Sequence, residues 1–202
     1  NTVWVLLAAF LVFSMQVGFV MLEAGFARSR ESINILVEGI VDTCICGVTF
    51  WAWGFAFMFE DGNGFIGGLS KAWLRGVHVD TVSGAVPETV FSMFQLTFAI
   101  ITPALIVGGF AERTRFAGML LFSLFWLILV YLPVTHWVWG GGWLQKMEFR
   151  DFAGGAVVLV ELGASVPRVA VVGTRRATAY GRQATADLVR GLPRGLDTPV
   201  SR

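Results

Sequence analysis

Charged residues are absent from four long apolar stretches of this chain, and this pattern is the strongest constraint on its fold. The charge-free stretches cover residues 1–22, 43–59, 89–111 and 116–145. A bilayer core about 30 Å thick needs roughly 20 apolar residues in a helix, because lipid offers no hydrogen-bond partner to an open backbone. A fifth apolar stretch begins at Phe152. The sequence therefore predicts an all-α, polytopic membrane protein.

The composition agrees with a membrane protein and argues against nucleic-acid binding. Hydrophobic residues make up 55% of the 202 residues and charged residues 14%, whereas a soluble domain carries roughly a quarter. Residues 1–158 hold 8 of the 15 basic and 11 of the 14 acidic side chains, so this part has no basic field for nucleic acid. The first stretch lacks the basic start of a signal peptide. Because the chain begins with Asn, we expect that an upstream piece is missing.

The basic residues of the short loops predict the orientation. Arg28 and Arg30 follow the first stretch, and Arg113 and Arg115 follow the third. Both loops are expected in the cytoplasm, because basic residues are enriched on that side. The loop over residues 60–88 is longer and net acidic, and we expect it outside. The amino terminus is therefore also expected outside.

Three acidic residues lie at or inside the ends of the predicted spans, namely Glu23, Glu38 and Asp42. A carboxylate in a membrane is by default a functional hypothesis, here a proton or cation path. The alternative is an interhelical or interfacial hydrogen bond completed by Asn34 and Arg28, and we favour it. The cysteines, only two residues apart in an apolar run, predict neither a disulfide nor a metal site.

Aromatic and acidic residues gather near the predicted external surface. Phe94 and Phe98 are four residues apart, so they share one helical face. Trp139 stands directly before three glycines, and Asp151 opens the DFAGG segment at the start of the fifth stretch. Aromatic faces attract cations, and a nearby carboxylate strengthens that field. The pattern favours recognition of a small cation at an outer vestibule, although packing and interface anchoring are the alternatives for each ring alone.

Four segments together resemble the ammonium transporter family, Amt/Rh. They are FSMQVGFVMLEAGFARSR, FQLTFAIITPALIVGGFAERTRF, PVTHWVWGGGWL and DFAGGAVV. The resemblance covers residues 3–158 and implies transmembrane transport of ammonium or ammonia, with methylammonium as a further candidate. It implies no enzyme activity and no cofactor. It also implies a homotrimer in the plasma membrane, each subunit having eleven helices in two inverted five-helix repeats. The chain would then hold the first five-helix repeat of a truncated family member.

The resemblance also implies the substrate-binding residues. Phe94, Phe98 and Trp139 match three aromatic rings of the family's external ammonium site, and Ala153 matches a residue that lines it. Asp151 matches a buried aspartate that favours the cation without touching it. A narrow hydrophobic pore is expected below this site, with Phe98 as one ring of its gate.

The resemblance fails at one pore position. The family has a pore-lining His eight residues beyond the DFAGG aspartate, and this chain has Leu159 there. The partner His belongs to the second repeat, for which residues 159–202 offer no equivalent. A nitrogen-regulatory signalling protein is a further partner that the resemblance implies, at the cytoplasmic face.

Residues 159–202 differ in composition from residues 1–158. They hold seven Arg, no Lys, no Phe and no Trp, and Glu161, Pro167 and Arg168 make insertion of a fifth span marginal. A basic, disordered cytoplasmic extension is one interpretation, and translation in a shifted reading frame is the one we favour. The sequence thus predicts a transporter-like domain over 1–158 and an atypical tail.

Two functions of other classes are alternatives to transport. An ammonium-sensing receptor would need a signalling domain, and the tail carries no kinase or cyclase signature. An intramembrane enzyme would need catalytic groups at membrane depth. His78 and His136 are instead expected near the external surface, so we predict that the chain is not an enzyme.

Overall fold

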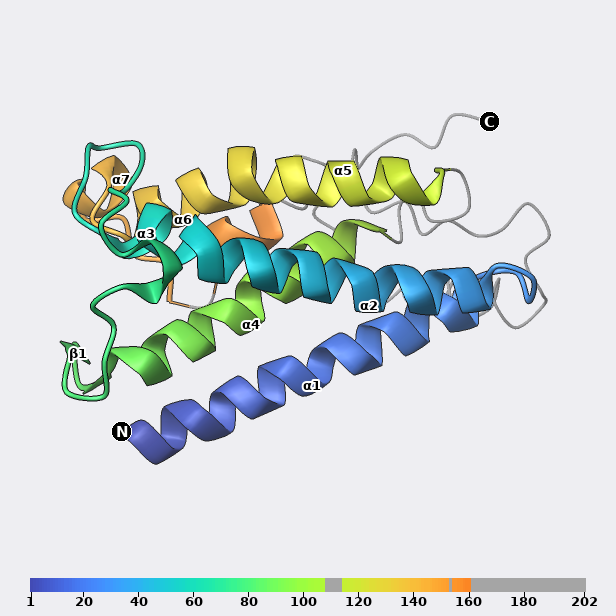
Figure 1. Cartoon of the computed structure of the whole chain (residues 1–202), viewed down its shortest axis with the longest axis horizontal. Helices are drawn as coiled ribbons and strands as arrows, with labels where there is room; N and C mark the ends of the chain where they lie inside the picture. Colours follow the sequence, from blue (N-terminus) through green and yellow to red (C-terminus); the bar gives the residue numbers. More distant parts are fainter. Residues whose placement is uncertain (108–113, 153, 161–202) are drawn as a thin grey trace, which may run out of the picture.

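The computed structural model describes residues 1–107, 114–152 and 154–160 as a bundle of long helices (Figure 1). Within this part of the chain, four helical segments are long and apolar enough to cross a membrane: Thr2–Phe26, Ser32–Phe59, Glu88–Ile106 and Phe116–Lys146. The prediction of an all-α membrane protein is confirmed for the described residues, in which the strands amount to one short hairpin.

The first two spans are joined by a short turn. The first is α1 (Thr2–Phe26), and the second is built from α2 (Ser32–Thr49), a π-helical turn η1 (Phe50–Gly54) and α3 (Phe55–Phe59). The large side chains of α1 are mostly exposed. An exposed apolar helix face of this length suits contact with lipid rather than water.

The third and fourth spans follow the loop after α3. The third is α4 (Glu88–Val107), with Pro103 inside it, and such prolines are tolerated where neighbouring helices satisfy the freed backbone groups. The fourth is built from α5 (Phe116–Trp126), the π-helical turn η3 (Leu127–Tyr131), α6 (Leu132–Trp139) and, after a break, α7 (Trp143–Lys146). A further π-helical segment, η4 (Gly155–Val160), opens the fifth apolar stretch.

The loop between the second and third spans carries the short elements. They are the 3-10 turn η2 (Ala72–Leu74) and the strands β1 (Val82–Ser83) and β2 (Val86–Pro87), which pair antiparallel with Val82 opposite Pro87. Trp73 has a left-handed backbone with φ 61°, which is rare for a bulky residue. Its ring meets that of Trp51 edge-on, with centroids 4.9 Å apart. This contact holds the loop against the second span.

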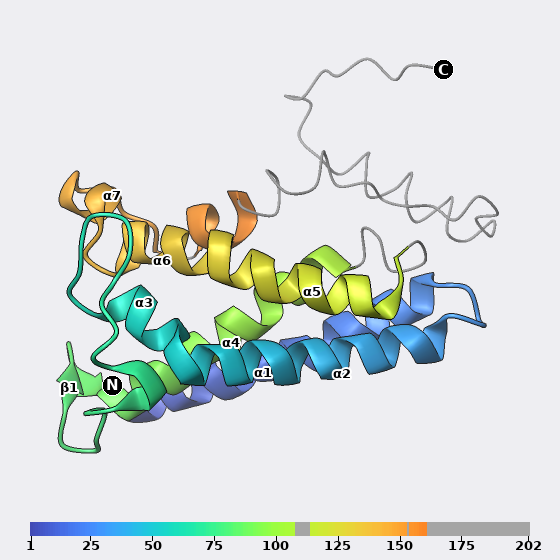
Figure 2. The same ribbon diagram turned by 45° about the horizontal axis from the view of Figure 1, so that its top comes forward.

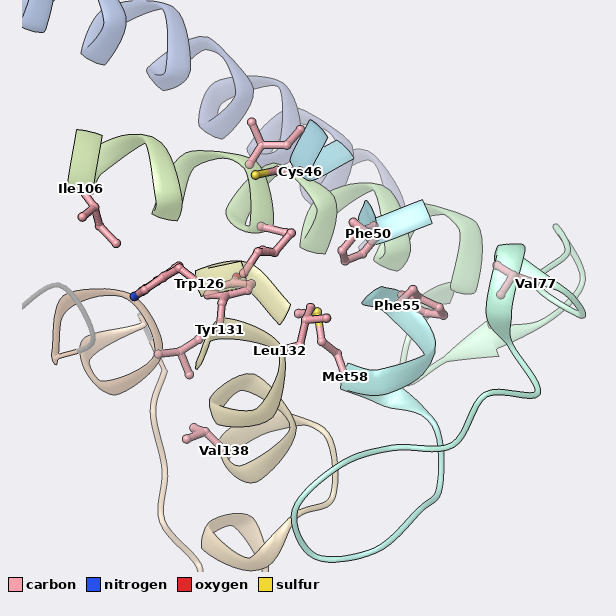
Figure 3. Packing of buried hydrophobic residues seen from close by; sticks show 14 residues of the cluster. Cys46, Phe50, Phe55, Met58, Val77, Ile106, Trp126, Tyr131, Leu132 and Val138 are labelled. Carbon is pink, nitrogen blue, oxygen red and sulfur yellow. The ribbon is translucent and has the colours of Figure 1, made fainter. Parts of the chain in front are cut away.

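Helix α4 packs against both α1 and α2, while α2 also packs against α5, and α3 against α6. A core of buried side chains fills the space between the second, third and fourth spans (Figure 3). Phe50, Phe55, Met58, Tyr131 and Leu132 are all at most 2% exposed. Lipid is as apolar as these side chains. They therefore stabilise the folded bundle through close packing rather than through removal from water.

The two ends of the bundle differ. Figures 1 and 2 show the amino terminus, the β-hairpin and α7 at one end, and the turn between α1 and α2 at the other. Arg28 and Arg30 lie in that turn, and α5 begins at the same end. The basic turn and the longer acidic loop therefore lie at opposite ends of the bundle, as the sequence predicts. Which end faces the cytoplasm stays a prediction.

The structure corrects one span boundary. The predicted first, third and fourth spans match helices, but the second begins at Ser32 rather than near residue 43. Glu38 and Asp42, expected near a span end, lie inside this helix and are 1% and 0% exposed. The carboxylates do not end the helix, because it buries them against its neighbours instead of exposing them to lipid.

Candidate functional site: Phe94, Phe98, Trp139 and Asp151

The third span presents two aromatic rings as one unit. Phe94 and Phe98 are half-buried on one face of α4, with ring centroids 5.1 Å apart and planes at 87°. At 1.5 Å per residue they stand about 9 and 15 Å along the helix from Glu88. Ring faces carry the negative part of the quadrupole that attracts cations, so the pair has the chemistry of a cation-binding wall.

The fourth span ends with a tryptophan that is tied to the fifth apolar stretch. The half-buried Trp139 closes α6, and its Nε1–H donates a 2.8 Å hydrogen bond to the carbonyl oxygen of Asp151. A Cβ added at Gly154 would lie 3.7 Å from the Trp139 ring. Gly154 has φ 78°, a backbone conformation suited to glycine. The indole is therefore fixed by residues on either side of Ala153.

The Asp151 side chain caps the helical start of the fifth apolar stretch. Its Oδ1 accepts a hydrogen bond from the backbone N of Gly155 at 2.8 Å. Its Oδ2 accepts from the backbone N of Ala156 at 2.7 Å and of Val157 at 3.1 Å. These amides would otherwise be among the unsatisfied donors at a helix start. Both carboxylate oxygens are thus held by backbone amides, which leaves the residue to act on a cation through its field.

The predicted site residues form two pairs. Phe94 contacts Phe98, and Trp139 contacts Asp151. Phe98 and Trp139 both pack against the core of the second, third and fourth spans, so the two pairs border the same core. Ala153 lies outside the described residues, and the side chain of Leu159 does too.

The carboxylates of the second span have local partners. Asn34 Nδ2 donates a 3.0 Å hydrogen bond to Glu38 Oε1, as the hydrogen-bond interpretation expected for Asn34. The Cys46 thiol is 3.7 Å from Asp42 Oδ1. The second oxygen of each carboxylate has no hydrogen-bond partner among the described residues. Within the same ranges no group of three potential metal-binding side chains occurs.

Sequence reasoning missed how the loop over residues 60–88 is fastened. The Glu60 carboxylate accepts hydrogen bonds from the Ser70 hydroxyl and, at 3.0 Å, from the backbone N of Lys71. The Lys71 ammonium forms an ion pair with Glu88 at the start of α4. His136, noted only as external, bridges two other segments of this region with its ring. The acidic residues at the two loop ends and the lysine between them were visible in the sequence, but their pairing was not.

Comparison with known proteins gives a consistent result. The model of the Ammonium Transporter Family matches residues 3–188. The chain is 40% identical over 174 residues to an ammonium transporter of Bacillus subtilis, covering 85% of this chain and 43% of that protein. It is 35% identical over 178 residues to the ammonium transporter Amt1 of Archaeoglobus fulgidus, covering 88% and 44%.

Solved structures agree with the sequence matches. The crystal structure of Candida albicans Mep2 matches with a TM-score of 0.71 and 32% identity, over 78% of this chain and 35% of that one. A structure described as a sensor Amt protein matches with a TM-score of 0.71 and 35% identity, over 78% and 40%. The chain thus spans less than half the length of these relatives. The family match includes residues 159–188 of the predicted tail, and the boundary after residue 158 stays a prediction.

Proposed function

The chain belongs to the ammonium transporter family, and we propose that it supplies the outer cation site and one wall of a path for ammonium or ammonia across a membrane. Three aromatic side chains, Phe94, Phe98 and Trp139, form the site together with Ala153. Asp151 supplies the favourable field. The observation that carries the proposal is the fixed position of Trp139, whose indole is bonded to the residue that caps the next span.

The chemistry of this site suits a small cation. An ammonium ion leaving water loses hydrogen bonds, and aromatic faces return part of that free energy, by about 2 kcal/mol or more when desolvated. A methylated ammonium would be attracted in the same way, so methylammonium is proposed as a second substrate. Whether the ion or neutral ammonia crosses beyond the rings depends on groups that lie deeper in the path.

Family membership supports further proposals about the whole protein. The complete path is proposed to lie between two inverted five-helix repeats, of which residues 1–158 supply the first. The assembly is proposed to be a homotrimer in the plasma membrane, with a nitrogen-regulatory signalling protein as a candidate partner at its cytoplasmic face. Residues 159–202 are proposed to be a separate tail, and the nucleotide sequence across codon 158 in all three frames would test whether a frame shift produced it.

Ammonium sensing is the alternative function. One structural relative is described as a sensor Amt protein, so this family-like fold is compatible with a sensor. A sensor needs the outer site but not a conducting path. The two functions differ in one observable, since only a transporter accumulates methylammonium inside the cell.

A chimera tests the proposed function. Residues 1–158 are joined to the remaining part of the Bacillus subtilis relative, with His restored at position 159, and expressed in cells that lack ammonium transporters. The proposal predicts growth on limiting ammonium and uptake of labelled methylammonium. A chimera that reaches the membrane in normal amount and takes up no methylammonium would contradict it. The 202-residue chain alone, in parallel, is expected not to rescue growth, because it provides one wall of the path.

A further inference from the structure

Two tryptophans at the end of α6 donate their indole N–H to backbone carbonyls of different segments. Trp137 Nε1–H donates a 2.8 Å hydrogen bond to the carbonyl oxygen of Phe65. Trp139 Nε1–H donates one of the same length to Asp151. Side chains two residues apart on an α-helix point about 200° apart. The last turn of α6 is therefore fastened on two faces, to the loop after α3 on one and to the segment before η4 on the other.

The loop after α3 meets the fourth span with three consecutive carbonyl groups, those of Asn63, Gly64 and Phe65. The Gly64 oxygen accepts a 3.1 Å hydrogen bond from the backbone N of Trp143. The Asn63 oxygen lies 3.0 Å from Nε2 of His136. With the bond from α6 to Phe65, these contacts join the loop to the end of the fourth span along a row of backbone oxygens.

The loop holds these carbonyl groups in place by its own hydrogen bonds. The side-chain Oδ1 of Asn63 accepts from the backbone N of Phe65 and of Ile66, each at 2.8 Å. The backbone N of Asn63 donates to the Ile66 carbonyl at 3.0 Å. An asparagine that bonds the backbone two residues on makes a defined turn. The Phe65 oxygen is therefore a fixed acceptor for the Trp137 indole.

The chain turns back directly after Trp139. The backbone N of Gly140 and the backbone N of Gly142 both donate to the carbonyl oxygen of His136, each at 3.0 Å. These two bonds close the end of α6 on itself, so its last turn moves as one unit. A displacement of Trp137 therefore displaces Trp139 as well.

We infer that Trp137 is a positioning residue of the cation site, because its hydrogen bond to the loop sets where the Trp139 ring stands. The consequence for binding rests on the proposed function, in which Trp139 is a wall of that site. A ring attracts a cation only within about 6 Å of its centroid. A small displacement of the Trp139 ring therefore changes the attraction.

Trp137 lies at the margin of the core. Its neighbours His136 and Val138 are 1% and 2% exposed, whereas Trp137 is half-buried. Its ring centroid lies 6.2 Å from that of Phe65 and 6.0 Å from that of Trp143, and these two residues are 65% and 39% exposed. Removal of the Trp137 N–H thus leaves the core in place. Anchoring at the membrane interface, the alternative role of an exposed tryptophan, would involve Trp143 equally.

Nitrogen-15 NMR of labelled tryptophan tests the positioning in the 202-residue chain in lipid bilayers. Trp137→Phe keeps an aromatic ring and removes the donor, and Trp139→Phe assigns the Trp139 signal. We expect solvent exchange of the Trp139 indole N–H to rise about twofold to tenfold in Trp137→Phe, the range that one net hydrogen bond gives. Trp143→Phe is the matched control, because its bond to the loop is made by the backbone. Unchanged exchange in Trp137→Phe, or an equal rise in both variants, would overturn the inference.

Uptake by the chimera described above tests the consequence for binding. Trp137→Phe should raise the KM for methylammonium about twofold to tenfold at unchanged maximal rate, since the loss of one net hydrogen bond acts on the site and not on the path. Phe65→Leu removes the ring contact but keeps the carbonyl acceptor, so this variant and Trp143→Phe should keep the parent KM. An unchanged KM in Trp137→Phe at normal membrane amounts would contradict a role in the cation site. If the parent chimera takes up no methylammonium, the proposed function fails, and the exchange of the Trp139 N–H alone decides whether Trp137 positions that ring.

Discussion

The Trp139 indole donates its hydrogen bond to the backbone carbonyl of Asp151, 12 residues further along the chain. The same aspartate uses its side chain to hold the first amides of η4. One residue thus fixes the direction of an aromatic ring and the start of the next span. This hydrogen bond gives the tryptophan at the end of α6 a defined position, as the proposed cation site requires of a wall residue.

The first prediction separates the ring of Trp139 from its hydrogen bond. In the chimera, Trp139→Leu removes the aromatic face and should weaken methylammonium uptake and its discrimination against other small cations. Trp139→Phe keeps a ring but loses the bond to Asp151, so an intermediate effect is expected. Competition assays measure both. Trp4→Leu is the matched control, since Trp4 is 75% exposed on α1. Equal behaviour of Trp139→Leu and this control would leave Trp139 as an interface anchor.

The second prediction concerns the Asp151 cap. Asp151→Ala removes the acceptor of three backbone amides, which costs about 0.5–2 kcal/mol for a typical cap, and it also removes the favourable charge. We expect transport to be lost and the melting temperature to fall. Asp151→Asn keeps one acceptor oxygen and should retain part of the transport activity and part of the thermal stability. Uptake and thermal unfolding of the same preparations test this, and wild-type transport by the Ala variant would refute the role.

The third prediction compares two glycines of very different surroundings. Gly140→Ala should strongly destabilise the end of the bundle near α7, because the new Cβ would collide with the Met58 carbonyl. Gly18 in α1 has no atom within 4 Å of an added Cβ. Gly18→Ala should therefore be neutral or stabilise the helix by up to about 1 kcal/mol. Thermal unfolding of both variants in one detergent tests this prediction. Similar melting temperatures would show that the close approach of Gly140 to the Met58 carbonyl is unimportant.

The fourth prediction decides between the two interpretations of the buried carboxylates. Glu38→Gln preserves an acceptor for the Asn34 amide and removes the titratable group. If the carboxylate serves as a hydrogen-bond partner, methylammonium uptake by the chimera stays near wild type. A proton or cation path through Glu38 would require the carboxylate. Loss of uptake at normal membrane amounts would therefore favour the path.

The spans could be predicted from the sequence because the absence of charge is a local property. The second span was the exception, since a buried carboxylate such as Asp42 looks the same in sequence as one at a span end. The pairing of Phe94 with Phe98 follows from helical spacing, and it was predicted. The hydrogen bond from Trp139 to Asp151 was not predicted, because it depends on how the irregular loop between them returns to the bundle.

The contacts of His136 show the same limit more clearly. Its partners Met58 and Asn63 are more than 70 residues away, and both contribute a backbone oxygen, so side-chain identity gives no signal. Gly140 was visible as one of three consecutive glycines, but the close approach that requires it was not. Residue types predict which chemistry is available, whereas such long-range backbone contacts come only from the fold.

The most direct test of the account is the KM of methylammonium uptake in a chimera that lacks all three aromatic rings. Phe94, Phe98 and Trp139 are replaced together by Leu, and the control replaces Trp4, Phe10 and Phe13, all exposed on α1, in the same way. An aromatic cation site predicts a KM raised about thirtyfold, since about 2 kcal/mol of cation attraction corresponds to roughly that factor. It also predicts that ammonium loses its advantage as a competitor, while the control is unchanged. Equal KM values for the two triple variants, at equal amounts in the membrane, would contradict a cation site at these rings.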